Sequence, residues 1–140
     1  MNTYRLSFVL FLSILGLTSL GQETQPPHPI DKKYQTCLDS NGSTIGMIEC
    51  ISSAKQEWDT ELNKYYNLLM TKLSRSEQLA LRETQRQWIT YKEKETKFYL
   101  DVYTEKEGTM WNVVMARRSM DIIRLRTIEL IEYYEALTQN

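Results

Sequence analysis

The feature that most constrains the fold is a long stretch without Pro or Gly that begins at Met47. Apolar side chains recur through it at steps of three and four, and this spacing places them on one face of an α-helix. At 1.5 Å per residue the stretch predicts a single amphipathic helix about 40 Å long. The apolar positions are Met47, Ile51, Ala54, Trp58, Leu62, Tyr65, Leu69 and Leu73.

Two further helices follow from the same spacing. Ser74 with Glu77 three residues later is a capping-box pattern, which predicts that a second helix begins there and runs to about Tyr103. The segment KEGT, residues 106–109, contains the only Gly of this region and predicts a turn. The second stripe comprises Leu81, Thr84, Trp88, Tyr91, Glu95, Phe98 and Val102, and the third comprises Val113, Ala116, Met120, Ile123, Thr127, Leu130, Tyr134 and Leu137.

No alternation typical of a β-strand occurs anywhere after residue 21. Long helices that are joined by short turns must lie antiparallel to their neighbours in the chain. We therefore predict an all-α fold: an antiparallel bundle of three long helices.

The N-terminus has the features of a secretory signal over residues 1–21. Arg5 precedes an apolar run from Phe8 to Leu17, and the small residues Ser19 and Gly21 follow. The run is too short for a comfortable membrane span. We expect a mature chain from Gln22, periplasmic or secreted, without stable membrane insertion after cleavage. Residues 22–36 are predicted to be an extended or disordered lead-in, because their first part is polar and rich in proline, and residues 37–140 to be the helical domain.

The two cysteines, Cys37 and Cys50, both follow this signal. An even count in an oxidising compartment favours one disulfide near the start of the domain. A structural zinc site would need four Cys or His ligands, and the chain adds only His28. We expect neither a metal nor a cofactor.

Catalytic patterns are also missing from the sequence. With one histidine there is no Ser/His or Cys/His set, and no Gly-rich phosphate loop is present. Neighbouring acids such as Glu57 and Glu61, or Glu93 and Glu95, are typical of a solvated helix face. The sequence therefore predicts a protein that is not an enzyme.

Four arginines in the last predicted helix could suggest nucleic-acid binding. Asp121 stands four residues after Arg117 and three before Arg124, which is the spacing of ion pairs within a helix. The whole chain has 17 Lys and Arg against 18 Asp and Glu, so its net charge does not favour nucleic acid either. The cluster comprises Arg117, Arg118, Arg124 and Arg126, and we expect local salt bridges there.

Polar residues lie beside the apolar stripe of the first long helix, at Asp59, Asn63 and Tyr66. Gln85 precedes Trp88 by three residues and is expected at the edge of the second helix's buried face. We predict a hydrogen-bond network between the helices, with Arg126 as the counter-charge of Asp59. Its role would be structural rather than catalytic.

Several motifs, in order, resemble one protein family. After C-x12-C come WDTELNKYY, LRETQRQWITYK and RTIEL, and together they resemble the LprI-like lysozyme inhibitor family of small exported bacterial helical domains, over residues 37–133. The shared motif positions are Asp59, Leu62, Asn63, Tyr66, Gln85 and Trp88. Members of that family often carry a second cysteine pair, but here Thr96 and Arg118 occupy those neighbourhoods.

The resemblance implies an inhibitor that binds lysozyme and blocks peptidoglycan cleavage. Acidic side chains could serve that contact at two places: around Glu57, Asp59 and Glu61, or in the turn TEKEGT at residues 104–109. The alternative is a periplasmic structural or adaptor module that binds another envelope protein. Its support is the nine tyrosines, some expected off the core stripes, such as Tyr99 and Tyr133. Either way we expect a protein partner, and the sequence leaves the oligomeric state open.

Overall fold

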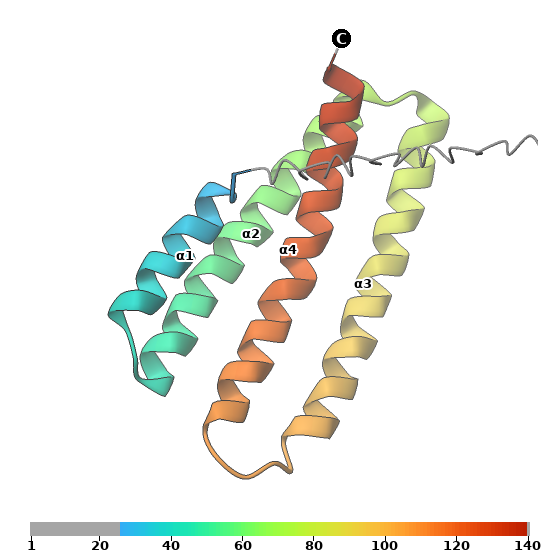
Figure 1. Cartoon of the computed structure of the whole chain (residues 1–140). Helices are drawn as coiled ribbons and strands as arrows, with labels where there is room; N and C mark the ends of the chain where they lie inside the picture. The colour runs from blue at the N-terminus through green and yellow to red at the C-terminus, as the bar shows by residue number, and fades with distance from the viewer. Residues whose placement is uncertain (1–25, 140) are drawn as a thin grey trace, which may run out of the picture.

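The computed structural model describes residues 26–139, which form four α-helices and no strand (Figure 1). The helices are α1 (Pro29–Ser40), α2 (Thr44–Lys72), α3 (Arg75–Tyr103) and α4 (Met110–Thr138). The predicted all-α fold and the three long helices are confirmed, but the count of three is wrong because α1 precedes them. The signal assigned to residues 1–21 lies outside the described residues. None of the described helices has the length and apolar character needed to span a membrane.

Residues 29–36, which were predicted to belong to an extended or disordered lead-in over 22–36, form the first part of helix α1. Residues 22–25 of that segment lie outside the described residues. Pro29 stands in its first turn, where proline is favoured because no backbone donor is needed there. The His28 ring accepts a hydrogen bond from the backbone N–H of Ile30 at 3.3 Å and stacks on Trp58, with the ring centroids 4.5 Å apart. Pro29 therefore marks the start of a helix, and the lone histidine has a structural role.

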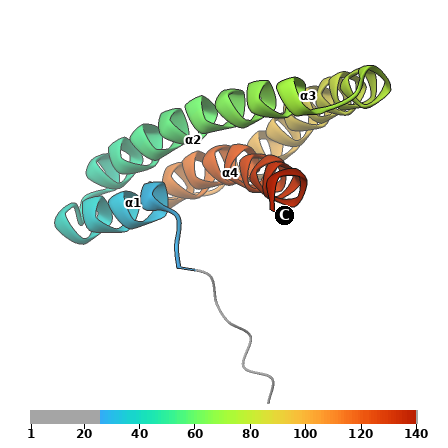
Figure 2. The same cartoon turned by 90° about the horizontal axis from the view of Figure 1, so that it is seen from above.

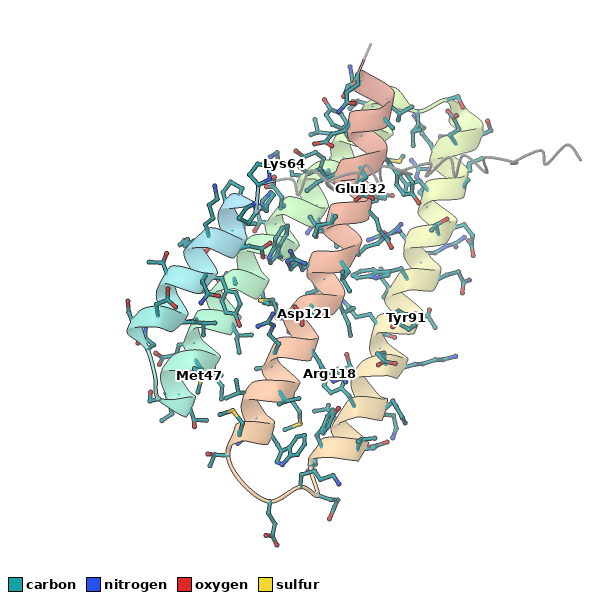
Figure 3. The ribbon with its side chains drawn as sticks, in the orientation of Figure 1. Met47, Lys64, Tyr91, Arg118, Asp121 and Glu132 are labelled. Carbon is teal, nitrogen blue, oxygen red and sulfur yellow. A yellow bond between two sulfur atoms is a disulfide. The ribbon has the colours of Figure 1, made fainter. Side chains whose placement is uncertain are left out.

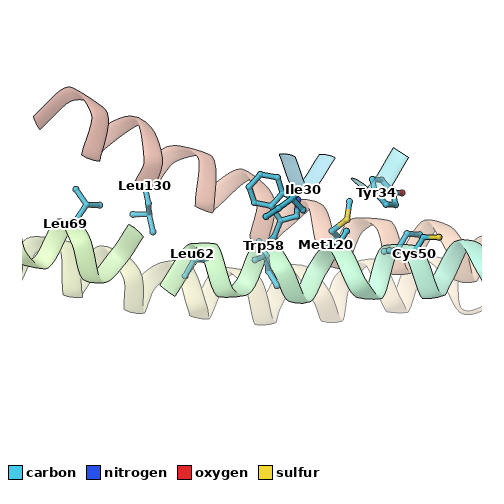
Figure 4. Packing of buried hydrophobic residues seen from close by; sticks show 11 residues of the cluster. Ile30, Tyr34, Cys50, Trp58, Leu62, Leu69, Met120 and Leu130 are labelled. Carbon is cyan, nitrogen blue, oxygen red and sulfur yellow. The ribbon is translucent and has the colours of Figure 1, made fainter. Parts of the chain in front are cut away.

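The core lies along the seam between α2 and α4. Figure 4 shows the buried side chains in a row between these two helices, with Ile30 of α1 beside Trp58 and Tyr34 of α1 near Cys50. The Thr127 hydroxyl lies 3.2 Å from the backbone oxygen of Trp58, across the seam, and 2.8 Å from that of Ile123 in its own helix. The largest side chains that are fully buried are Trp58, Ile51, Leu69, Met120, Leu130 and Thr127.

Two links hold α1 against this seam. The predicted Cys37–Cys50 disulfide is confirmed and joins α1 to α2, with a Cα–Cα distance of 5.7 Å. Arg124 of α4 donates from Nε and Nη2 to the two carboxylate oxygens of Asp31, at 2.8 and 2.5 Å. The hydrogen bonds with Asp31 raise the pKa of Arg124 despite its partial burial. A fork-shaped contact of this kind fixes orientation as well as distance.

The turn between α1 and α2 depends on a close approach at Gly46. A side chain there would place its Cβ 2.9 Å from the Cβ of Asn41, which is closer than carbon atoms pack. Asn41 in turn donates from Nδ2 to the backbone oxygen of Cys37 at 2.8 Å. The start of α2 and the end of α1 are therefore in direct contact beside the disulfide.

Helix α3 is packed less completely than the other helices. Figures 1 and 2 show it on the side of the α2–α4 pair opposite to α1. Tyr99 is its single buried residue, at 4% exposure, although the sequence predicted it off the core stripe. Tyr91 and Phe98, which were predicted in the stripe, are exposed. The predicted stripe followed an average step of 3.5 residues, and over several turns that spacing drifts from the face of a straight helix.

Replacing both cysteines, Cys37→Ser with Cys50→Ser, is expected to lower the free energy of unfolding by about 3 kcal/mol, because the unfolded chain regains the freedom of the closed loop. Urea denaturation followed by far-UV circular dichroism measures the change. The wild-type protein in reducing agent should lose the same amount, and Thr36→Ser, an exposed position on α1, should lose almost none. Unfolding of the double variant at the urea midpoint of the oxidised wild type would contradict the role given to the disulfide.

Candidate functional site

The motif residues of α2 do not form a network with the other helices. Leu62 is buried in the core, whereas Asp59 and Asn63 are exposed and Tyr66 is half-buried. The Nδ2 of Asn63 donates to the backbone oxygen of Asp59 at 2.8 Å and lies 3.4 Å from the Oδ2 of the Asp59 carboxylate. These two polar side chains therefore satisfy each other within one turn of α2.

Arg126 has other partners than the one predicted. Its Nε donates to Oε1 of Gln85 at 3.1 Å, and its Nη1 donates to Oε2 of Glu129 at 2.8 Å. The predicted pairing with Asp59 is wrong, because one helical step beyond the buried Trp58 turns Asp59 towards solvent. Gln85 does lie half-buried at the edge of α3, and Trp88 packs against the core cluster one turn later.

Three of the four arginines of α4 form ion pairs with different partners, whereas Arg118 forms none with the described residues and lies over the ring of Tyr103. Arg117 donates to Asp121 at 3.3 Å, as the spacing predicted, and from Nη1 to the Tyr34 hydroxyl at the same distance. Burial lowers the pKa of Arg117, but the charge of Asp121 and the contacts with Tyr34 outweigh it and the pKa is raised. Arg124 bonds to Asp31 and Arg126 to Glu129. The cluster therefore presents no continuous basic surface.

An open groove of about 630 Å³ runs over α4, between α1 and α3. Figure 3 labels four of its residues: Met47, Tyr91, Arg118 and Asp121. Its lining combines apolar side chains with charges of both signs. In residues 26–139 no group of three or more His, Cys, Asp or Glu side chains is placed to hold a metal ion.

The first of the two predicted acidic surfaces is largely neutralised. Glu57 forms an ion pair with Lys33 of α1 at 2.7 Å, and Glu61 forms one with Lys64 at 2.7 Å. The hydrogen bond with Glu61 raises the pKa of Lys64 against a smaller opposing effect of burial. Only Asp59 of that surface lacks a cationic partner among the described residues.

The second acidic surface is the turn at residues 104–109, and it is exposed throughout. Within residues 26–139, Glu105 and Glu107 form no ion pair. Gly108 has a φ of 95°, a backbone conformation that favours glycine. The two carboxylates therefore remain available on a turn of defined shape.

This turn is anchored on both sides. The rings of Tyr103 and Trp111 stack across it, with centroids 5.1 Å apart, and the guanidinium of Arg118 lies 5.3 Å from the centre of the Tyr103 ring. The hydroxyls of Thr44 and Thr109 are 3.4 Å apart and connect the turn to the start of α2.

Large apolar side chains are exposed beside the turn. Ile45, next to Thr44, is 71% exposed, and Met110, next to Thr109, is 57% exposed. Figure 1 shows the α1–α2 and α3–α4 turns at the same end of the molecule. We call Ile45, residues 104–109 and Met110 the tip. It combines free carboxylates with exposed apolar side chains, which makes it the strongest candidate for a protein-binding surface.

Known proteins were compared with the chain by sequence and by structure. A family model described as lysozyme inhibitor LprI matches residues 37–130, from α1 into α4. A crystal structure of an uncharacterised protein from Burkholderia thailandensis is similar, with a TM-score of 0.76, 26% sequence identity and 82% of this chain covered. The chain covers 58% of that protein's chain. Among curated proteins, none matches the sequence.

The contacts of Arg126 yield a double-mutant prediction. Gln85→Leu is expected to lower the free energy of unfolding by about 1–3 kcal/mol, because the buried guanidinium loses the acceptor of its Nε–H. Asp59→Asn, on the exposed face of α2, should change it by less than about 0.5 kcal/mol. Urea denaturation of the single variants and of each one combined with Arg126→Met gives the coupling energies. Coupling of Arg126 with Asp59, and none with Gln85, would show that the assignment of partners is wrong.

Proposed function

The chain belongs to the LprI family of lysozyme inhibitors, and from that premise we propose that it is an exported protein that binds lysozyme and thereby prevents cleavage of peptidoglycan. The observation that carries the proposal is the family match over residues 37–130. These residues begin at the disulfide cysteine of α1 and include all of α2 and α3. The inhibitor would act by occupying the enzyme, without chemistry of its own.

The tip is the surface that we assign to this contact. Lysozyme binds its glycan in a cleft, and a turn that lies at the end of a helix pair can enter a cleft. Animal-type lysozymes are commonly strongly basic, so Glu105 and Glu107 would favour association. Ile45 and Met110 would supply apolar area at the centre of the contact. Because the stacked rings and the threonine contact already order the turn, little conformational freedom would be lost on binding.

The other acidic surface offers less to a basic partner. Glu57 and Glu61 are already compensated by lysines, and breaking those pairs would offset part of any gain. This difference supports the tip over the middle of α2.

A second candidate function is an adaptor that binds another envelope protein through α3. The observation that favours it is the number of large apolar side chains that are exposed on this loosely packed helix. They are Leu79, Ile89, Tyr91, Phe98, Leu100 and Val102. Of the two tyrosines that the sequence offered in support of an adaptor, Tyr99 is buried and therefore gives no support. Tyr133 is exposed.

The proposal predicts stoichiometric inhibition of cell-wall turnover by the purified protein. Animal-type, goose-type and invertebrate-type lysozymes should each be assayed at low and moderate salt, and inhibition should weaken as salt screens the carboxylates. Reversing both charges, with Glu105→Lys and Glu107→Lys, should weaken inhibition by about tenfold or more, because the tip would then repel a basic partner.

The matched control is a double reversal on another exposed surface, Glu93→Lys with Glu132→Lys, which should inhibit like the wild type. Equal inhibition by the tip variant and the wild type would place the contact elsewhere. No inhibition of any of the three enzymes by a folded, disulfide-bonded protein would overturn the proposed function and favour the adaptor.

A further inference from the structure

One guanidinium nitrogen in the interior lacks a hydrogen-bond partner. Arg126 is only 6% exposed, and its Nη2 is buried with no acceptor among the described residues. Buried charged groups normally use their donors fully, because water is not available to replace a missing acceptor. An unused donor on a buried arginine therefore points to an acceptor that the chain itself does not supply.

The position of this nitrogen indicates the kind of acceptor. Nε and Nη2 share one edge of the planar guanidinium, and two parallel N–H groups on one edge match the two oxygens of a carboxylate. In the structure Gln85 uses only one of these donors, since its Oε1 accepts from Nε at 3.1 Å. Glu129 binds the other side of the guanidinium, through Nη1. On the Nε–Nη2 edge, the Nε–H group therefore donates to the neutral oxygen of Gln85, and Nη2 has no acceptor among the described residues.

Gln85 connects this edge to a surface groove. A groove of about 500 Å³ lies between α2 and α3 and is lined by Tyr66, Leu79, Arg82, Gln85, Arg86 and Ile89. The same glutamine is therefore part of the groove wall and the neighbour of the buried guanidinium. A rotation of its side chain would expose the Nε–Nη2 edge to a ligand in the groove.

The groove has the charge and the apolar surface that suit an acidic peptide. Arg82 forms no ion pair with any residue of 26–139, while Arg86 pairs with Glu83. Leu79 and Ile89 are exposed in the same lining. A cation at the rim attracts a carboxylate, and the apolar side chains can hold a neighbouring apolar residue of the peptide.

We propose that this groove binds a peptide carboxylate, which displaces the Gln85 oxygen and bonds to Nε and Nη2 of Arg126. The carboxylate is either an acidic side chain or the free C-terminus of the peptide, since both present the same two oxygens. The groove shares no residue with the tip, so this site is proposed separately from the lysozyme contact.

The test uses three synthetic peptides and the ¹⁵N-labelled protein. Acetyl-Leu-Glu-Leu-amide has only a side-chain carboxylate, acetyl-Leu-Gln-Leu with a free C-terminus has only a terminal one, and acetyl-Leu-Gln-Leu-amide has neither. Titration is followed at the Nε–H resonance of Arg126. At least one acidic peptide should shift this resonance in a saturable way, the neutral peptide should not, and the more effective acid identifies the source of the carboxylate.

Two variants make the test specific. Gln85→Ala removes the competing oxygen and should tighten binding of the acidic peptide by roughly tenfold, whereas a merely structural glutamine would give no gain. Arg82→Gln should weaken binding by about two- to fivefold, as expected for one exposed charge. Arg118→Gln is the matched control on the groove over α4 and should leave binding unchanged. Circular dichroism confirms that each variant is folded.

Three results would overturn the proposal. The first is an unmoved Arg126 resonance with both acidic peptides at millimolar concentration. The second is an equal response to the neutral peptide, which would mean apolar docking alone. The third is weaker binding in folded Gln85→Ala, because the glutamine would then be part of the binding site and not its competitor. None of these results bears on inhibition of lysozyme, which is measured separately.

Discussion

The seam between α2 and α4 is the contact on which the rest of the structure depends. It contains the largest fully buried side chains, and burial of an aliphatic one such as Ile51, Leu69, Met120 or Leu130 stabilises the fold by about 1.5–3 kcal/mol through removal from water. Thr127 links the two helices in the same place by its approach to the backbone oxygen of Trp58. The disulfide and the two ion pairs of α1 are all made to these two helices. The tip is formed at the first residues of α2 and α4. The packing of these two helices along the seam therefore sets how the parts of the tip lie relative to each other.

The two sides of this seam differ in how firmly they are held, and the two candidate surfaces differ accordingly. The side with α1 is fixed by the disulfide, by Asp31 with Arg124, and by the stacking of His28 on Trp58. On the other side α3 buries only Tyr99 and contacts Arg126 through Gln85. A tip of ordered shape suits a large protein partner that binds without rearrangement. A groove with a rotatable glutamine in its wall suits a small flexible ligand that can displace this side chain.

Much of the fold could be predicted from the sequence, because α2 and α4 follow a regular apolar spacing without breakers. The start of α3 could be predicted too, since Ser74 and Glu77 form the capping box that their spacing indicates. Helix α1 was missed because three prolines were interpreted as a linker, although Pro29 stands where a helix accepts proline. The partners of Arg126 and the neutralisation of Glu57 by Lys33 could not be predicted, because both depend on how separate helices are rotated against one another. The turn at 104–109 was recognisable as a candidate site; the unused donor of Arg126 was not, since it exists only in the packed structure.

We propose above that the tip binds lysozyme as a preformed surface. Hydrogen–deuterium exchange of the protein alone and with stoichiometric lysozyme would locate the contact, because the exchange of each backbone segment is measured within one complex. Binding at the tip should slow exchange around residues 44–46 and 103–111 and leave α3 from Gln78 to Ile89 unchanged. Protection confined to α3, or protection of the middle of α2 with none at the tip, would contradict it.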